Sequence, residues 1–352
     1  MGTNISDEIC ILGTLSFGAV VFVVYGFGWF VGTFNVIDLS DGGLGGENIC
    51  HYVCRRMLGM LLAQYASYKR YEQRFLSECY IRDDGRVNLT HIETDIVIGC
   101  NLRCCYCSHL SPYRKGYVPI EKIVHWFEIW SKKIRPYTFY LLGGEPFLHP
   151  DLANIITESY RIWDSSTLEL VTNGLLIPHA SKDIFDALRK TKMKVSISDH
   201  SSIDIPNEKI VAACDCLKNN GVSYVVQPSN TQWYVHHKLD ENNTPSPFQC
   251  VPLDAWSVCI AKNCPSLASN RLYKCAVLAG IIESVAENAF SATRWKDALT
   301  YKPLSPDTDA NTILEHFHSY FVKECSVCPN EFMLTEATQI PLSWILQKEK
   351  QE

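Results

Sequence analysis

The sequence has no excess of basic residues: 32 Lys and Arg stand against 38 Asp and Glu, for a formal net charge of −6. A domain that binds nucleic acid by covering phosphates needs a basic face, so this balance argues against a nucleic-acid partner. The chain also lacks low-complexity tracts. With 47% hydrophobic and 20% charged residues it has the composition of a folded globular protein, and its 352 residues predict about two domains.

Charged side chains are absent from Ile9 to Ile37, a stretch long enough to span a bilayer. The stretch also lacks the basic start and the small-residue cleavage site of a secretory signal, which favours a retained membrane anchor at residues 9–37. Acidic residues precede it and basic residues follow it, so the positive-inside rule predicts that the bulk of the chain is cytoplasmic. A buried strand and turn is the competing interpretation, because the glycines here weaken a helix.

Composition divides the chain into four parts. Residues 1–37 form the hydrophobic segment, 38–88 a linker with an amphipathic helix, 89–238 a region of alternating strands and helices, and 239–352 a cysteine-bearing extension. The predicted strands of the third part are short apolar runs at Ile92–Ile98, Tyr137–Leu142, Thr167–Val171, Met193–Ile197 and Ser223–Val226. Their spacing leaves room for helical crossovers, which predicts an α/β fold with a parallel sheet or partial barrel.

The chain has 16 cysteines, and three of them form a Cys-x3-Cys-x2-Cys loop at Cys100, Cys104 and Cys107, directly after the first predicted strand. Cysteines this close in sequence do not easily pair with one another, and a chain of this length does not need disulfides, so metal ligation is the better interpretation. Three thiolates hold three irons of a 4Fe–4S cube and leave the fourth iron open to another ligand. A zinc ribbon would show paired Cys-x2-Cys arms, which this loop lacks.

Polar or glycine residues also follow the other predicted strands. The second strand runs into the segment Gly143, Gly144, Glu145 and Pro146. Glycines at a strand end allow close approach of the backbone to a ligand, and a carboxylate beside them suits an ammonium group. The third and fourth strands end near Asn173, Ser196 and Ser198. Because chemistry in βα barrels lies at the carboxyl ends of the strands, we expect these residues to share one site.

The three-cysteine loop, with the aromatic Tyr106 before its last cysteine, and the Gly-Gly-Glu-Pro segment together resemble the radical S-adenosylmethionine superfamily over roughly residues 90–335. The resemblance implies a partial (β/α)6 TIM-like barrel. It implies a 4Fe–4S cluster on the three cysteines whose open iron binds S-adenosylmethionine, with Tyr106 near the adenine. The Gly-Gly-Glu-Pro segment would hold the methionyl amino group, and Asn173, Ser196 and Ser198 would line the nucleoside pocket.

The resemblance also implies the reaction. One electron from a low-potential donor such as flavodoxin or ferredoxin would cleave S-adenosylmethionine into methionine and a 5′-deoxyadenosyl radical, which takes a hydrogen atom from a small-molecule or peptide substrate. The protein's part would be to exclude water and to hold the target carbon close to the nascent radical.

A second cysteine group comprises Cys259, Cys264, Cys275, Cys325 and Cys328. It resembles the twitch form of a SPASM-type extension, a small cysteine-rich α+β domain that holds one auxiliary 4Fe–4S cluster. Either Cys259 or Cys264 would be the first ligand, and Asn270 stands where the family has Gly at the hairpin turn, a position that Asn tolerates. A zinc site made from the same residues is the alternative.

An auxiliary cluster implies a two-electron oxidation of a sugar, a cyclitol or a peptide side chain. The sequence does not separate these substrates. The rival function is a non-catalytic, membrane-tethered iron–sulfur electron carrier or a zinc-stabilised interaction protein, which predicts no cleavage of S-adenosylmethionine.

Overall fold

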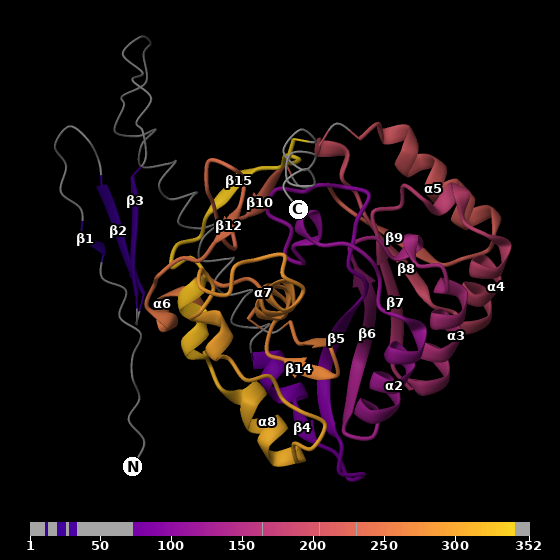
Figure 1. The fold of residues 1–352 in the computed structure, drawn as a ribbon, viewed down its shortest axis with the longest axis horizontal. Coiled ribbons are helices and arrows are strands. Elements are labelled where there is room, and N and C mark those ends of the chain that lie inside the picture. The colour runs from indigo at the N-terminus through magenta and orange to yellow at the C-terminus, as the bar shows by residue number, and fades with distance from the viewer. Residues whose placement is uncertain are drawn as a thin grey trace. The chain divides into compact units, whose positions relative to one another are not determined.

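The computed structural model describes residues 73–341, apart from 164, 204, 230 and 263, together with the backbone of three strands nearer the N-terminus. The chain forms two units, Met1–Arg74 and Phe75–Glu352 (Figure 1). The first unit contains an antiparallel sheet of β1 (Ile11–Leu12), β2 (Val20–Tyr25) and β3 (Gly28–Thr33). Valines and aromatic residues dominate β2 and β3, and they favour strands.

The predicted membrane anchor is not supported by this first unit. What is described of Ile9–Ile37 is strand, as in the strand-and-turn interpretation, and not a spanning helix. Among the described residues, none of the helices combines the length and the apolar character needed to cross a bilayer. The predicted linker and amphipathic helix fall outside the described residues as far as residue 72.

The second unit is built on a mostly parallel sheet, as the sequence predicts. Five parallel strands follow one another in chain order: β5 (Val87–Val97), β6 (Ile134–Gly143), β7 (Thr167–Thr172), β8 (Lys194–Ser198) and β9 (Tyr224–Gln227). Each overlaps one of the predicted apolar runs. The crossover helices are α2 (Ile120–Trp130), α3 (Leu152–Ile162), α4 (Lys182–Thr191) and α5 (Asn207–Asn219), which cover one face of the sheet (Figure 1).

Apolar spacing explains why the helices lie on that face. In α2 the buried residues are Ile123, Trp126, Phe127 and Trp130, which recur at the period of a helix and form one stripe. Phe127 meets Phe139 of β6 edge to face, with ring centroids 4.9 Å apart. Burial of each such side chain contributes about 2 kcal/mol, and the resulting core fixes the strands whose ends carry the site.

The cysteine-bearing extension continues the same sheet. β13 (Ser266–Ala268) pairs in parallel with β5, and β14 (Arg271–Tyr273) pairs with β13 as a hairpin, which gives the order β14-β13-β5-β6-β7-β8-β9. Asn270 at the turn has φ 58°, so the expected tolerance of Asn at this position is confirmed. The (β/α)6 count needs correction: within the described residues five strands come from successive βα units, and the sixth parallel strand is β13.

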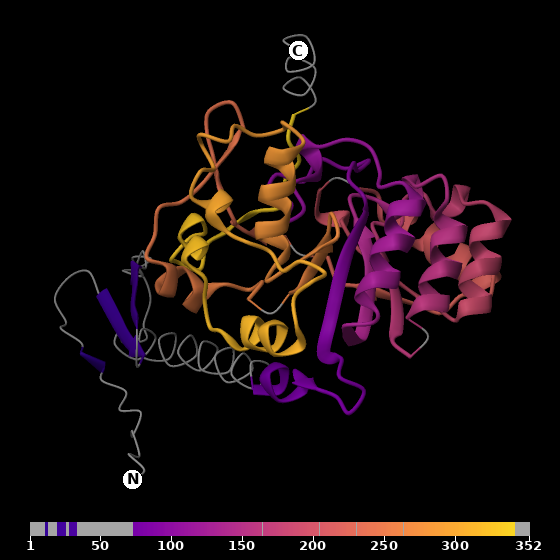
Figure 2. The same ribbon diagram turned by 60° about the horizontal axis from the view of Figure 1, so that its bottom comes forward.

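Further short elements complete the second unit. The helices are α6 (Pro252–Val258), α7 (Ala276–Ala286) and α8 (Ala310–His318). The strands are β4 (Tyr80–Ile81), which pairs with β5, and the two antiparallel pairs β10 (Gln232–Tyr234) with β15 (Leu334–Glu336) and β11 (Lys238–Leu239) with β12 (Pro245–Ser246). In both views α7 lies on the opposite side of β5 from α2 to α5 (Figure 2).

An ion pair between a buried guanidinium and a partly exposed carboxylate joins the segment after the three-cysteine loop to the end of α7. Two nitrogens of Arg114, whose side chain is 5% exposed, donate to the two carboxylate oxygens of Glu287 at 2.7 and 2.6 Å. Glu287→Ala leaves this guanidinium without its partner and is expected to lower the free energy of unfolding by about 2–3 kcal/mol in urea titrations.

The matched control is Glu128→Ala, which breaks an ion pair with Arg161 whose side chains are 52% and 48% exposed. Exposed pairs contribute little, so the expected change is below about 0.5 kcal/mol. Equal effects of the two substitutions would contradict a special role for the pair that contains the buried guanidinium.

Candidate functional site

The three-cysteine loop lies just beyond the carboxyl end of β5, with all three thiols half-buried. The amide of Leu102 donates to the Cys100 sulfur at 3.3 Å, and the amide of Cys107 donates to the Cys104 carbonyl at 3.3 Å, which folds the loop tightly. Cys100 and Cys104 pack against a small apolar cluster around Leu102, Ile203 and Ala337. The sequence therefore brings these thiols together on one loop.

Burial governs the chemistry of these thiols. It raises the pKa of Cys100 to about 12, and it raises the pKa of Cys104 further, with the neighbouring Cys107 and Cys100 thiols adding to the effect. Such thiols become thiolates only when a cation replaces the proton. Within the described residues no three His, Cys, Asp or Glu side chains converge on a point that would hold a single metal ion. The thiolates of an iron–sulfur cube bind different irons, so this donor set fits a cluster.

The two glycines of the Gly-Gly-Glu-Pro segment lie directly against the strand that carries the cysteine loop. A Cβ on Gly143, which has φ +133°, would lie 2.1 Å from the Val97 carbonyl oxygen, and one on Gly144 would lie 1.8 Å from that of Gly99. The amides of Gly144 and Glu145 donate to those same two carbonyls, at 2.8 and 3.1 Å. Only glycine fits here, so the segment and the cysteine loop form one unit.

Glu145 is fully buried, and donors surround its carboxylate. Thr172 Oγ1 and the Phe147 amide donate to Oε1 at 2.6 and 3.1 Å, and the Asn173 amide donates to Oε2 at 2.9 Å. Burial raises the pKa of Glu145, and these three hydrogen bonds act against the increase. The carboxylate thus ties the end of β6 to the end of β7, and its contact with a methionyl ammonium stays a prediction.

The other predicted nucleoside-pocket residues lie along the same edge of the sheet. The Asn173 side-chain amide donates to Asn101 Oδ1 at 2.7 Å and to the Cys100 sulfur at 3.8 Å, so it connects β7 to the cysteine loop. Ser196 is buried within β8 and accepts a hydrogen bond from Gln227 at 3.4 Å, whereas Ser198 ends that strand. The Tyr106 ring packs against His237, with centroids 5.4 Å apart. The structure therefore brings Asn173 to the cysteine loop, and the other assignments remain predictions.

The sequence gives no signal for a C-terminal segment that lies along the cysteine loop. The amide of Cys105 donates to the Thr338 carbonyl at 3.0 Å, and that of Ile340 donates to the Arg103 carbonyl at 2.7 Å. The Arg103 guanidinium returns a hydrogen bond to the Ile340 carbonyl at 3.0 Å, and the Thr338 hydroxyl donates to the buried Cys105 sulfur at 3.2 Å. This segment holds the loop in shape.

Ile340→Pro tests this clamp, because proline removes the donor to the Arg103 carbonyl. We expect chelators to extract iron about tenfold faster from this variant. Loss of one hydrogen bond should make opening of the loop easier by roughly 1.4 kcal/mol, which raises the population of the open loop about tenfold. Ile340→Val keeps the amide and most of the side chain and is expected to match the wild type. Equal extraction rates for all three proteins would show that the segment does not restrain the loop.

His109, a residue that the sequence analysis does not single out, is half-buried beside the cysteine loop. Burial lowers the pKa of this imidazole, but Asp95 on β5, whose carboxylate lies 2.9 Å from Nδ1, more than reverses the effect, and the pKa rises to about 10. A signal was present in β5, where two acidic residues, Glu93 and Asp95, interrupt a strand otherwise typical of a core and call for a cationic or donating partner.

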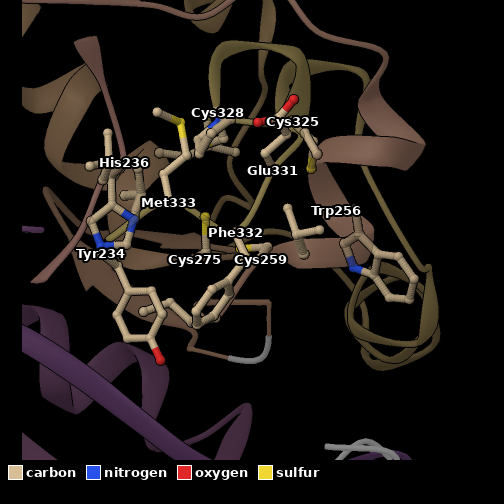
Figure 3. A pocket seen from close by; sticks show the side chains of 17 residues that line it. Tyr234, His236, Trp256, Cys259, Cys275, Cys325, Cys328, Glu331, Phe332 and Met333 are labelled. Atoms are coloured by element: carbon tan, nitrogen blue, oxygen red, sulfur yellow. The ribbon is translucent and has the colours of Figure 1, made fainter. Parts of the chain in front are cut away.

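Four cysteines of the second group line one pocket: Cys259, Cys275, Cys325 and Cys328 (Figure 3). Apolar and aromatic side chains surround them, including Trp256 and Phe332. Cys264 is not among the lining residues, and its thiol donates to Glu93 Oε2 on β5 at 3.3 Å. Of the two candidates for the first ligand, the geometry therefore places Cys259 with the others.

Burial again dominates the electrostatics of this pocket. It raises the pKa of Cys259 to about 11 and raises those of Cys275 and Cys328 further, with neighbouring cysteines adding to each increase. Four half-buried thiols in one pocket are a suitable donor set for a cluster, in which each thiolate binds a different iron. A single zinc ion needs its donors at one point, and among the described residues no three such side chains converge in that way.

The family model that matches this chain spans the first site. Residues 95–227 match the family described as the Radical SAM superfamily. A GTP 3′,8-cyclase of Clostridium acetobutylicum is 28% identical over 150 residues, which cover 38% of this chain and 45% of that protein. The protein of the same name from Aquifex aeolicus is 32% identical over 123 residues, which cover 32% of this chain and 35% of that one.

The chain thus matches less than half the length of these curated relatives. Among solved structures, one described as BtrN in complex with AdoMet and 2-DOIA is 12% identical, covers 68% of this chain and 91% of its own, and has a TM-score of 0.35.

Proposed function

We propose that the chain is an enzyme that reductively cleaves S-adenosylmethionine and abstracts a hydrogen atom from a substrate, because its residues 95–227 match the Radical SAM superfamily. The observation that carries the proposal is the locked contact between the Gly-Gly-Glu-Pro segment and the strand leading to the three-cysteine loop. Two motifs that are separate in the sequence meet there, and backbone hydrogen bonds join the Gly-Gly-Glu-Pro segment directly to the residues before the cysteine loop.

Cys100, Cys104 and Cys107 would hold the 4Fe–4S cluster, which when bound supplies the electron that splits the carbon–sulfur bond of S-adenosylmethionine. Asn173 positions the loop by its hydrogen bonds to Asn101 and Cys100. The Glu145 carboxylate ties the Gly-Gly-Glu-Pro segment to the end of β7, because it accepts hydrogen bonds from Thr172 and Asn173 as well as from Phe147. Tyr106, Ser196 and Ser198 are proposed to contact the nucleoside, and Cys100 and Cys104 pack on one side against the apolar cluster around Leu102.

We further propose that Cys259, Cys275, Cys325 and Cys328 hold an auxiliary 4Fe–4S cluster in a twitch-like extension. The pocket that these four cysteines share supports this set over one that includes Cys264, whose thiol is hydrogen-bonded to Glu93. The reaction would then be a two-electron oxidation: the substrate gives a hydrogen atom to the deoxyadenosyl radical, one further electron to the auxiliary cluster and a proton to solvent. The curated relatives are named as cyclases, a different type of reaction.

Anaerobic protein, analysed for iron and sulfide and then mixed with dithionite and S-adenosylmethionine, tests the proposal. We expect methionine and 5′-deoxyadenosine to accumulate. An electron carrier without turnover, or a zinc-stabilised interaction protein, predicts no cleavage. Zinc in place of iron, or iron without cleavage, would overturn the proposed function.

A further inference from the structure

A row of polar side chains crosses the sheet at one level. Glu93 of β5 lies directly opposite Tyr140 of β6 in the register of the sheet. Tyr140 in turn lies opposite Glu169 of β7, and Glu169 lies opposite Lys194 of β8. Direct cross-strand partners lie on the same face of a sheet. We call these four residues the polar row.

The polar row lies on the face of the sheet away from α2 to α5. Its immediate neighbours in the chain, such as Ile92, Phe139 and Val195, belong to the apolar core that those helices cover. Because side chains alternate along a strand, the polar row points to the opposite face, the side of β5 on which α7 lies (Figure 2). Barrel interiors are normally filled with Val, Ile and Leu, so folding alone does not account for this composition.

The carboxylates of the polar row are buried, and one is only partly satisfied. Glu93 is 6% exposed; its Oε2 accepts from the Cys264 thiol, whereas Oε1 has no hydrogen-bond partner in the part of the chain that the structure describes. Glu169 is 8% exposed, and its Oε2 lies 3.3 Å from Nζ of Lys194. Tyr140 lies between the two acids. A buried polar atom left without a partner costs about 1–3 kcal/mol, which a ligand that supplies the partner removes.

The position of the row also suits a substrate. Glu93 lies four residues before the end of β5 at Val97, so the row is about 13 Å below the strand ends that carry the candidate S-adenosylmethionine site. Ser196, two residues beyond Lys194, lies on the same face and between the two levels. The row and Ser196 therefore line the face of the sheet that leads from its interior toward the candidate S-adenosylmethionine site.

We propose that Glu93, Tyr140, Glu169 and Lys194 recognise the substrate, and that this substrate is a small polyhydroxylated ring, a sugar or a cyclitol, and not a peptide side chain. The inference rests on the proposed function. Acceptors and donors alternate along the row: carboxylate, phenol, carboxylate and ammonium. Each hydroxyl of such a ring both donates and accepts, so neighbouring hydroxyls match neighbouring members of the row. A hydroxyl-bearing peptide side chain carries only one hydroxyl and cannot match four members of the row. An apolar side chain would leave all of them unpaired, and an anion would face two carboxylates.

Isothermal titration calorimetry on the anaerobic holoenzyme tests the inference, with myo-inositol, glucose, glucosamine and a serine-containing peptide as probes. We expect at least one ring compound to bind and the peptide not to bind. Glu169→Gln and Lys194→Met should each weaken binding at least about tenfold, and Lys194→Arg, which keeps the cation, should restore most of it. Lys190→Met, an exposed substitution on α4, should leave the dissociation constant unchanged.

Unchanged iron content and melting temperature would show that the variants are folded. Binding of none of the three ring compounds, or binding that is equal in the wild type and the Lys194→Met variant, would overturn the inference. The proposed function fails separately: if the wild type binds a ring compound through Lys194 but forms no 5′-deoxyadenosine, recognition by the row stands and the radical chemistry does not.

Discussion

Replacement of Cys100, Cys104 and Cys107 together by alanine is expected to abolish cleavage of S-adenosylmethionine and to lower bound iron from about eight to about four atoms per chain. The physical reason is that the three thiols lie on one tight loop at the end of β5, so together they form the donor set for one cluster. The second group of cysteines lies elsewhere in the chain and should keep its own iron. Iron analysis and chromatography of the dithionite-driven reaction measure both effects.

A matched control removes cysteines from a helix away from both sites. Cys214 and Cys216 lie on α5, and their double alanine variant should keep both the iron and the cleavage activity. If the triple variant keeps about eight irons, or cleaves S-adenosylmethionine at the wild-type rate, the loop is not the site of the first cluster.

Gly144→Ala is expected to be the most damaging single substitution at the site. The added Cβ would lie 1.8 Å from the Gly99 carbonyl oxygen, which belongs to the backbone and has no rotamer with which to move away. The Gly-Gly-Glu-Pro segment and the cysteine loop must then separate. We expect a loss of about 4 kcal/mol in the free energy of unfolding and a fall of at least about 100-fold in the rate of cleavage, because small misplacements of reacting groups are costly.

Gly85→Ala separates this clash from the ordinary cost of a left-handed backbone. Gly85 has φ +80°, but a Cβ there would meet nothing within 4 Å. This variant should lose only about 1–2 kcal/mol and keep its cleavage rate. Equal loss of stability and activity in the two variants, measured by urea denaturation and product analysis, would contradict the tight contact at Gly144.

The parallel sheet could be predicted because its strands carry short apolar runs with room for helices between them. β6 and β7 illustrate this, since Phe139, Leu141 and Leu170 face the helices in both pattern and structure. The three-cysteine loop and the two glycines could also be found, because these residue types have few other uses at the ends of buried strands. Local sequence therefore identifies the parts of the site that follow directly from a strand end.

Contacts between distant segments could not be predicted in this way. Thr338 and Ile340 carry no motif, and their pairing with the cysteine loop depends on where the last part of the chain returns. The inward hydrogen bonds of Glu145 depend on Thr172 of the next strand. The polar row likewise emerges only from the register of neighbouring strands, which single-sequence periodicity does not give.

The N-terminal stretch shows a different limit. Absence of charge over Ile9–Ile37 describes a bilayer-spanning helix and a run of apolar strands equally well. In the structure the described part of this stretch forms strands such as β2 and β3 and not a helix, in keeping with its valines, aromatic residues and glycines.

The most direct test of iron-bound S-adenosylmethionine at the cysteine loop is electron paramagnetic resonance of the dithionite-reduced Cys325→Ala/Cys328→Ala variant, which should retain only the first cluster. An open iron at Cys100, Cys104 and Cys107 predicts that S-adenosylmethionine changes the g values of the cluster signal. A signal that stays the same at saturating S-adenosylmethionine would mean that the protein itself supplies a fourth ligand, which would contradict the proposed chemistry.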